Sequence, residues 1–151
     1  MFDSRDVAAY IAQQCQERGI EYNNTKIQKL LYCVYGVMLA WKGERICDEY
    51  PRLWPYGPVF PKVFKFIDKG QEIASYSDFF EDAANRDERV VVSRVLDRYG
   101  QFSAVALSEW SHNPRSAWSK TKAEGAPWNS FIPDEYIAAY FKEYVVESAR
   151  V

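Results

Sequence analysis

The sequence contains few of the residue types that bind metals or form disulfides. Among its 151 residues there is one histidine, His112, and there are three cysteines, Cys15, Cys33 and Cys47, with no CxxC pair. An odd number of widely spaced cysteines disfavours both a disulfide framework and a structural zinc site. Reduced thiols of a cytoplasmic protein are the simplest interpretation. We therefore expect no metal and no cofactor.

Long apolar runs and a leader-like N-terminus are also lacking. The longest nearly apolar stretch covers residues 30–41, and its 12 residues are too few to span a bilayer. The first ten residues, MFDSRDVAAY, do not show the basic segment followed by an apolar one that marks a signal peptide. The sequence therefore predicts a cytoplasmic protein with no membrane partner.

An excess of positive charge is lacking as well. The chain has 19 lysines and arginines against 21 aspartates and glutamates, and its net charge is −2. A dedicated nucleic-acid binder usually carries a basic domain, so no nucleic-acid partner is expected. Aromatic residues are abundant in contrast, because 5 Trp, 11 Tyr and 9 Phe make up 17% of the chain. We expect some of them to lie half-exposed, where Tyr and Trp favour protein interfaces.

Helical periodicity dominates the rest of the pattern. A chain of this length corresponds to one ordinary domain, so residues 1–151 are expected to form a single domain. The clearest stripe lies in the second expected helix, which Asn24 or Thr25 would cap and Gly43 would end. That stripe consists of Ile27, Leu30, Leu31, Val34, Met38 and Trp41. We predict a mainly α, compact domain of about six helices with this helix at its centre. Residues 90–92 would also suit a strand.

Two segments break the helical pattern. Residues 44–58 hold prolines and a glycine that cannot share one helix, so they predict an ordered connection with room for a short β-hairpin. Gly57 is expected in a tight turn with positive φ, and Pro58 at the first position of the next helix. Residues 111–132 are expected to be irregular, and the last helix to start at Pro133.

No spacing typical of catalysis accompanies the single histidine. Motifs such as G-x-S-x-G and H-E-x-x-H are absent, so no catalytic residue is predicted. His112 is expected to form a hydrogen bond across a helix end and to fix a turn. Two hypotheses stay open at a lower rank: a small enzyme that uses His112 with Glu109 or Asp134, and a DNA-binding regulator.

Three blocks of residues carry a resemblance to a known family. TKIQKLLY at residues 25–32 resembles the LQKLLY opening of the Panacea domain, WPYGPVFPKV at 54–63 resembles its W-x-YGPV-x-P-x-V block, and LSEWSH at 107–112 resembles its L-x-x-x-SH segment. The family-motif positions are Gln28, Lys29, Leu30, Leu31, Tyr32, Trp54, Tyr56, Gly57, Pro58, Val59, Pro61 and His112. The family often has Pro-Trp soon after the Ser-His, and both Trp118 and Trp128 are candidates for that tryptophan.

The resemblance implies a function by protein–protein binding. Panacea proteins include SocA-like antitoxins and phage-associated proteins, which neutralise toxins encoded beside them. This chain would accordingly neutralise a cognate protein toxin, such as a toxic alarmone synthetase or another translation inhibitor, by direct binding. The alternative that the resemblance implies is a proteolytic adaptor that delivers its toxin to the ClpXP protease. Self-association into a homo-oligomer stays open.

The motif residues are interpreted as scaffold, and the partner surface is expected elsewhere. Leu30 and Leu31 would lie in the core, while Gln28 and Lys29 would hydrogen-bond the irregular backbone nearby. We expect the toxin to bind the exposed side of the helix after Pro58 and the acidic, aromatic segment 72–88. The candidate contact residues are Phe60, Lys62, Lys65, Lys69, Tyr76, Phe79, Phe80, Glu81 and Asp82.

The aromatic residues divide into an expected core set and a surplus. Those on helical stripes or in the turn motif are expected in the core, namely Tyr32, Trp41, Trp54, Tyr56, Phe64, Tyr99, Trp110, Phe141 and Tyr144. Two stretches, residues 76–80 and 118–131, hold the surplus and are expected at the surface. A partner should cover at least one of these stretches.

Overall fold

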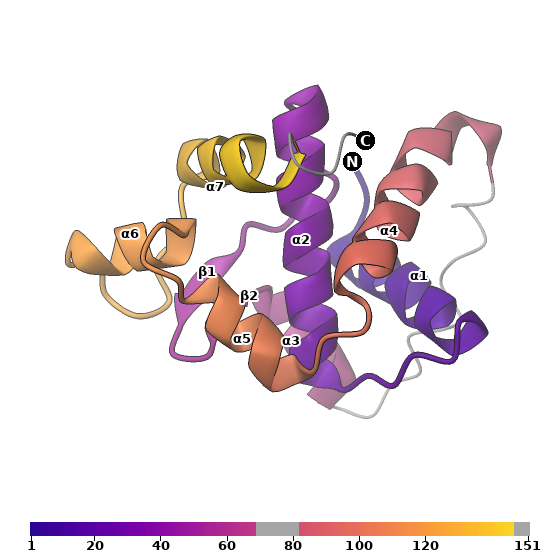
Figure 1. Cartoon of the computed structure of the whole chain (residues 1–151), viewed down its shortest axis with the longest axis horizontal. Coiled ribbons are helices and arrows are strands. Elements are labelled where there is room, and N and C mark those ends of the chain that lie inside the picture. Colours follow the sequence, from indigo (N-terminus) through magenta and orange to yellow (C-terminus); the bar gives the residue numbers. More distant parts are fainter. Residues whose placement is uncertain (69–81, 147–151) are drawn as a thin grey trace.

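The computed structural model, shown in Figure 1, describes residues 1–68 and 82–146. These residues form seven α-helices and one two-stranded antiparallel sheet. The helices are α1 (Ser4–Glu17), α2 (Asn24–Lys42), α3 (Pro61–Asp68), α4 (Arg86–Tyr99), α5 (Ala104–Ser111), α6 (Ala117–Ala123) and α7 (Asp134–Phe141). The strands are β1 (Arg52–Trp54) and β2 (Gly57–Val59), and two further short helices are the 3₁₀ helix η3 (Ala83–Asn85) and the π-helix η4 (Lys142–Val146). The predicted mainly α fold with a short hairpin is therefore confirmed.

Helix α2 is the axis of the fold, as its periodicity predicts. Residues 26–40 are all buried, and α1, α3, α4, α5, α7 and β2 pack against them. Figure 1 shows α2 running through the middle of the molecule, with α1 and α4 on one side and α5 and α7 on the other. A Cβ added at Gly36 would lie 2.3 Å from the ring of Phe141, so glycine permits the close approach of α2 and α7. Among the described helices, none combines the length and the apolar character that crossing a membrane requires.

Side-chain caps fix where the first two helices begin. Asp3 caps α1 by accepting from the backbone N–H of Arg5. The cap of α2 is Asn23, which accepts a hydrogen bond from the backbone N–H of Lys26. The expected caps Asn24 and Thr25 are therefore wrong, because α2 begins at least one residue earlier than its apolar stripe indicates.

The hairpin forms within the proline- and glycine-rich connection. Trp54 lies opposite Gly57 in its register, and Gly57 has the expected positive φ, +113°. The expected place of Pro58 at the start of a helix is wrong, because Pro58 belongs to β2 and α3 begins at Pro61. Pro61 is suited to that position for the same reason, since its ring presets a helical φ and no N–H is needed there.

A third extended segment pairs with the outer edge of β1. The N–H of Leu53 donates to the carbonyl of Ser130 at 2.8 Å, and the carbonyl of Leu53 accepts from the N–H of Asn129 at 2.7 Å. The N–H of Ile132 donates to the carbonyl of Pro51 at 3.1 Å. This pairing joins two segments far apart in the sequence and places residues 128–131 beside the hairpin.

Helix α6 contradicts the expectation that residues 111–132 are wholly irregular. Ser116 caps it by accepting from the N–H of Ser119, and Trp118 and Thr121 are buried on its inner side. A helix of seven residues is too short for apolar periodicity to reveal it. Helix α4 in turn removes the strand alternative for residues 90–92.

Several aromatic residues lie where the sequence does not lead us to expect them. Trp54 and Phe64, both expected in the core, are only half-buried and lie outside the core cluster. Trp41 and Tyr56 are 38% and 74% exposed rather than in the core, because one lies in the last turn of α2 and the other in the hairpin turn. Trp118 is buried, although its stretch is expected at the surface. Trp128 and Phe131 from the same stretch are 52% and 53% exposed, as expected.

Candidate partner-binding surface

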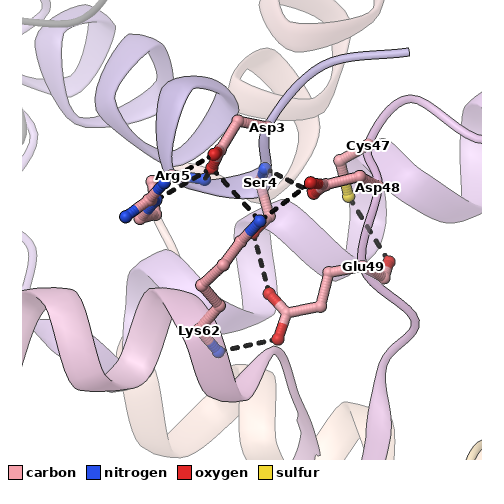
Figure 2. Close-up of polar contacts among 7 residues, drawn as sticks. All are labelled: Asp3, Ser4, Arg5, Cys47, Asp48, Glu49 and Lys62. Carbon is pink, nitrogen blue, oxygen red and sulfur yellow. Dashed lines mark hydrogen bonds and ion pairs between the residues drawn. The ribbon is translucent and has the colours of Figure 1, made fainter.

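A polar cluster ties α1 and α3 to the chain that leads into the hairpin (Figure 2). The carboxylate of Glu49 accepts from the hydroxyl of Ser4 at 2.8 Å and from the backbone N–H of Lys62 at 2.7 Å. One side chain thus joins the first turns of both helices. The Lys62 ammonium lies 2.8 Å from a carboxylate oxygen of Asp48 and 3.5 Å from one of Asp3. These contacts fix the backbone just before β1.

The charges of this cluster are largely satisfied within it. The side chain of Arg5 donates to Asp3 and lowers the pKa of that carboxyl to about 2. Burial raises the pKa of Glu49, against the effect of its hydrogen bonds with Lys62 and Ser4. Lys62, one of the expected partner contacts, is held by two carboxylates and half-buried. The positive charge of Lys62 is therefore compensated by carboxylates of the same chain.

Family-motif residues of α2 hold the backbone that follows β2. The N–H of Phe60 donates to Oε1 of Gln28 at 2.7 Å, and Nε2 of Gln28 donates to the carbonyl of Phe60 at 3.2 Å. Gln28 thus serves irregular backbone, as expected. Leu30 and Leu31 lie in the core, also as expected, and Tyr32 is buried with them.

Lys29 is buried beneath the hairpin without a carboxylate partner among the described residues. Its Nζ donates to the carbonyl of Pro58 at 3.1 Å, and burial lowers its pKa to about 8. A Cβ added at Gly57 would lie 2.8 Å from Cε of Lys29 and 2.5 Å from Oγ of Ser111. Glycine is therefore required at position 57 both by its φ and by these neighbours.

His112 and Trp118 hold the turn of the hairpin from its other side. Nε2 of His112 lies 3.1 Å from the carbonyl oxygen of Pro55, and Nε1 of Trp118 donates to the carbonyl of Trp54 at 2.9 Å. The rings of His112 and Trp118 pack with their centroids 4.0 Å apart. Burial lowers the pKa of His112. The histidine thus fixes a turn from the end of α5, as expected.

The residues of the enzymatic hypothesis do not assemble into a relay. Asp134 accepts from the hydroxyl of Tyr35 at 2.5 Å, and the ring nitrogen of His112 contacts the Pro55 carbonyl instead of a carboxylate. Within residues 1–68 and 82–146, no group of three or more His, Cys, Asp and Glu side chains is placed to hold a metal ion. The described geometry therefore favours a scaffold role for His112.

Five exposed or half-buried aromatic rings lie in the hairpin, in the chain just before it and in the segment paired with it. We call Tyr50, Trp54, Tyr56, Trp128 and Phe131 the aromatic face. Nε1 of Trp54 donates to Oδ1 of Asn129 at 3.0 Å. Asn129 has a φ of +72°, a left-handed conformation that asparagine tolerates better than most residues. The aromatic face is thus built on hydrogen-bonded backbone rather than on a free loop.

Positive side chains lie over three rings of the aromatic face. Cζ of Arg52 is 4.2 Å from the ring centre of Phe131, and Cζ of Arg45 is 4.2 Å from that of Tyr50. The rings of Tyr50 and Phe131 meet edge to face at 5.3 Å. Nζ of Lys122 lies 5.8 Å from the ring centre of Trp128. The arrangement combines exposed aromatic area with cation–π contacts.

The structure moves the candidate surface away from several expected residues. Phe60 is wrong as a surface contact, because it is fully buried against Tyr35 and Gln28. Lys65 is exposed, as expected, and Asp82 is exposed but caps η3 by accepting from the N–H of Ala84. The other candidates, Lys69, Tyr76, Phe79, Phe80 and Glu81, lie outside the described residues.

The expected contacts do not include Tyr50 and Arg52, nor Trp54 and Tyr56, which are expected in the core. A sequence signal for Arg52 exists, because side chains alternate between the two faces of a strand. The apolar Leu53 is buried, and its neighbours Arg52 and Trp54 are half-buried on the other face of β1. No comparable local signal marks Tyr50, because its neighbour Phe131 is distant in the sequence.

Comparison with known proteins agrees with the motif blocks. The family model described as "Antitoxin SocA-like, Panacea domain" matches residues 27–119, a range that includes Trp118 and not Trp128. The curated Antitoxin SocA of Caulobacter vibrioides (strain NA1000 / CB15N) is 26% identical over 139 residues, which cover 84% of this chain and 69% of that protein. No solved structure matches the chain. Since the family model spans more than half of its residues, the chain belongs to the SocA-like antitoxin family with the Panacea domain.

Proposed function

We propose that this chain is an antitoxin that neutralises a cognate protein toxin by direct binding, and that the aromatic face is its binding surface. Membership of the family and the similarity to Antitoxin SocA support the function. The observation that carries the choice of surface is a set of exposed aromatic rings on the hairpin turn, just before the hairpin and on the segment hydrogen-bonded to β1. The chain acts by binding rather than by catalysis, and it acts in the cytoplasm.

The composition of the aromatic face is that of a binding hot spot. Tyrosine, tryptophan and arginine carry a large share of the energy in protein interfaces. Tyr56, Trp128 and Phe131 each expose more than half of their surface, and Arg52 lies over one of these rings. A partner that covers them removes apolar area from water, which contributes about 25 cal/mol per Å².

The buried motif residues support this surface by preorganising it. Gln28 and Lys29 bind the carbonyls of Phe60 and Pro58, and His112 and Trp118 contact those of the hairpin turn. A surface held in its bound conformation loses little conformational entropy on association. The family motif therefore supplies the scaffold, and the exposed rings supply the contacts.

Co-expression with the product of the adjacent gene tests the proposal. We expect that product to arrest growth alone, this chain to restore growth, and the two proteins to co-purify. A neighbour that is harmless alone, or one that stays toxic and does not co-purify, would contradict the proposal. The half-life of the toxin in the complex then separates occlusion from delivery to ClpXP, since an unchanged half-life excludes delivery.

A further inference from the structure

Two adjoining hollows form one groove across the aromatic face. The first, of about 450 Å³, lies between Trp54 and Trp128. The second, of about 530 Å³, lies beside Arg52 and Phe131. Pro61, Lys65 and Asn129 line both hollows, so the two are continuous over the start of α3.

The two ends of the groove differ in chemistry. The first hollow is lined by Trp54, Trp128, Pro55 and Pro61, which suits an apolar or aromatic side chain. The second hollow adds Arg52 to Lys65, which lines both hollows, and it also contains Lys62 with Asp48 and Glu49. A ligand that follows the groove would thus meet apolar and then positive surface.

The positive charge at that end is uncompensated within the described part of the chain. Arg52 donates to the backbone carbonyl of Asn129 at 3.0 Å, and neither Arg52 nor Lys65 forms an ion pair there. The carboxylates in the same hollow are engaged already, because Asp48 pairs with Lys62 and Glu49 accepts two hydrogen bonds. Arg52 and Lys65 are therefore left without an ion-pair partner among the described residues.

We propose that the groove binds an extended acidic segment of the toxin, with an apolar side chain between Trp54 and Trp128 and a carboxylate at Arg52 and Lys65. The inference rests on the proposed antitoxin function, since the segment belongs to the toxin. Arginine fixed by a backbone hydrogen bond is preorganised for a carboxylate. A nucleic acid fits less well, because its regularly spaced phosphates would also lie beside Asp48 and Glu49, whereas the proposed segment places one carboxylate, at Arg52 and Lys65.

Titration calorimetry with the purified full-length chain and the purified toxin tests this inference. We expect Lys65→Glu and Trp128→Ala each to weaken binding by about ten-fold or more, and Lys65→Glu to reduce the dependence of affinity on salt. Matched controls are Lys142→Glu and Phe102→Ala, which change an exposed lysine and a half-exposed ring outside the groove. Both groove variants should fold normally by circular dichroism, because their side chains are exposed.

The outcomes distinguish the proposal that the groove is the binding site from the proposal that the chain is an antitoxin. If the wild-type chain binds the toxin and both groove variants bind equally well, the groove is not the site and the antitoxin function stands. If the wild-type chain does not bind the toxin, both proposals fail. A mobility shift of single-stranded DNA that Trp128→Ala abolishes, or a homodimer in size-exclusion chromatography that the same variant dissociates, would overturn the acidic-segment proposal in favour of that other occupant.

Discussion

Tyr56 and Gly57 are neighbours in one motif block, but Tyr56 is exposed and Gly57 is buried. The tyrosine side chain is 74% exposed, whereas a side chain at position 57 would collide with Lys29 and Ser111. The motif thus combines an exposed residue, which we propose as a partner contact, with a glycine that the backbone and its buried neighbours require. Sequence reasoning predicts the positive φ of Gly57 from its neighbours in the chain, and misplaces Tyr56 in the core because exposure depends on the whole fold.

Replacing Gly57 should be costly in two ways. Gly57→Ala is expected to lower the free energy of unfolding by about 2–3 kcal/mol, from backbone strain and from steric overlap. Gly125→Ala is the matched control, because Gly125 also has positive φ, +85°, with nothing within 4 Å of an added Cβ. It should cost only about 1 kcal/mol. Urea unfolding measures both, and equal costs would contradict the role of Lys29 and Ser111.

Tyr56→Ala should leave the fold intact and remove a partner contact. The side chain is exposed in the hairpin turn, so the free energy of unfolding should change by less than about 0.5 kcal/mol. Affinity for the toxin should fall by about ten-fold or more. The two measurements are urea unfolding and titration calorimetry. Loss of folded protein would show instead that Tyr56 is structural.

Lys29 should give the stability of the protein a distinctive dependence on pH. Burial lowers its pKa from 10.5 to about 8, so between these two values the unfolded chain binds more protons at this site than the folded chain. The free energy of unfolding should therefore rise with pH over this range, by on the order of 2–3 kcal/mol. Lys29→Met should lack that rise, and parallel pH profiles for the two proteins would refute the account.

At the scale of elements, the hairpin depends on a segment that lies 75 to 81 residues later in the chain. Asn129 joins the two, because its N–H donates to Leu53, its side chain accepts from Trp54 and its carbonyl accepts from Arg52. Elements with strong local signals, such as α2, are predictable from the sequence. The pairing with residues 129–132 is not, because no local pattern encodes a contact across that distance.

Two substitutions at Asn129 separate its backbone role from its side-chain role. Asn129→Gly keeps the left-handed conformation and loses only the hydrogen bond from Trp54, so about 1 kcal/mol is expected. Asn129→Ala loses the same bond and adds backbone strain, for a total of about 2 kcal/mol. Thermal unfolding of both variants provides the test. An alanine variant as stable as the glycine variant would argue against strain at this position.

Local signals also explain the errors in the predicted element boundaries. Pro58 suits either the first turn of a helix or a strand beside a turn, and the choice depends on Gln28, which holds the backbone at Phe60. Helix α6 is short and mostly polar, so its packing against the hairpin through Trp118 decides its formation. In both cases tertiary contacts decide between local alternatives.

At the scale of the whole molecule, the candidate surface combines three stretches of the chain. Residues 45–56, the start of α3 and residues 128–131 contribute its rings and charges. The sequence indicates that some aromatics must be exposed, and Trp128 and Phe131 confirm this. It does not indicate that they meet Tyr50 and Arg52, since that requires the pairing with β1.

If the toxin covers the aromatic face, it should slow amide exchange there. Hydrogen–deuterium exchange of this chain, measured with and without purified toxin, tests this. We predict that amides of the hairpin turn and of residues 126–131 exchange more slowly in the complex. Residues 100–105, which carry the exposed Phe102 and Val105, should exchange at unchanged rates. Protection at residues 100–105 without protection at the hairpin and residues 126–131 would contradict the account.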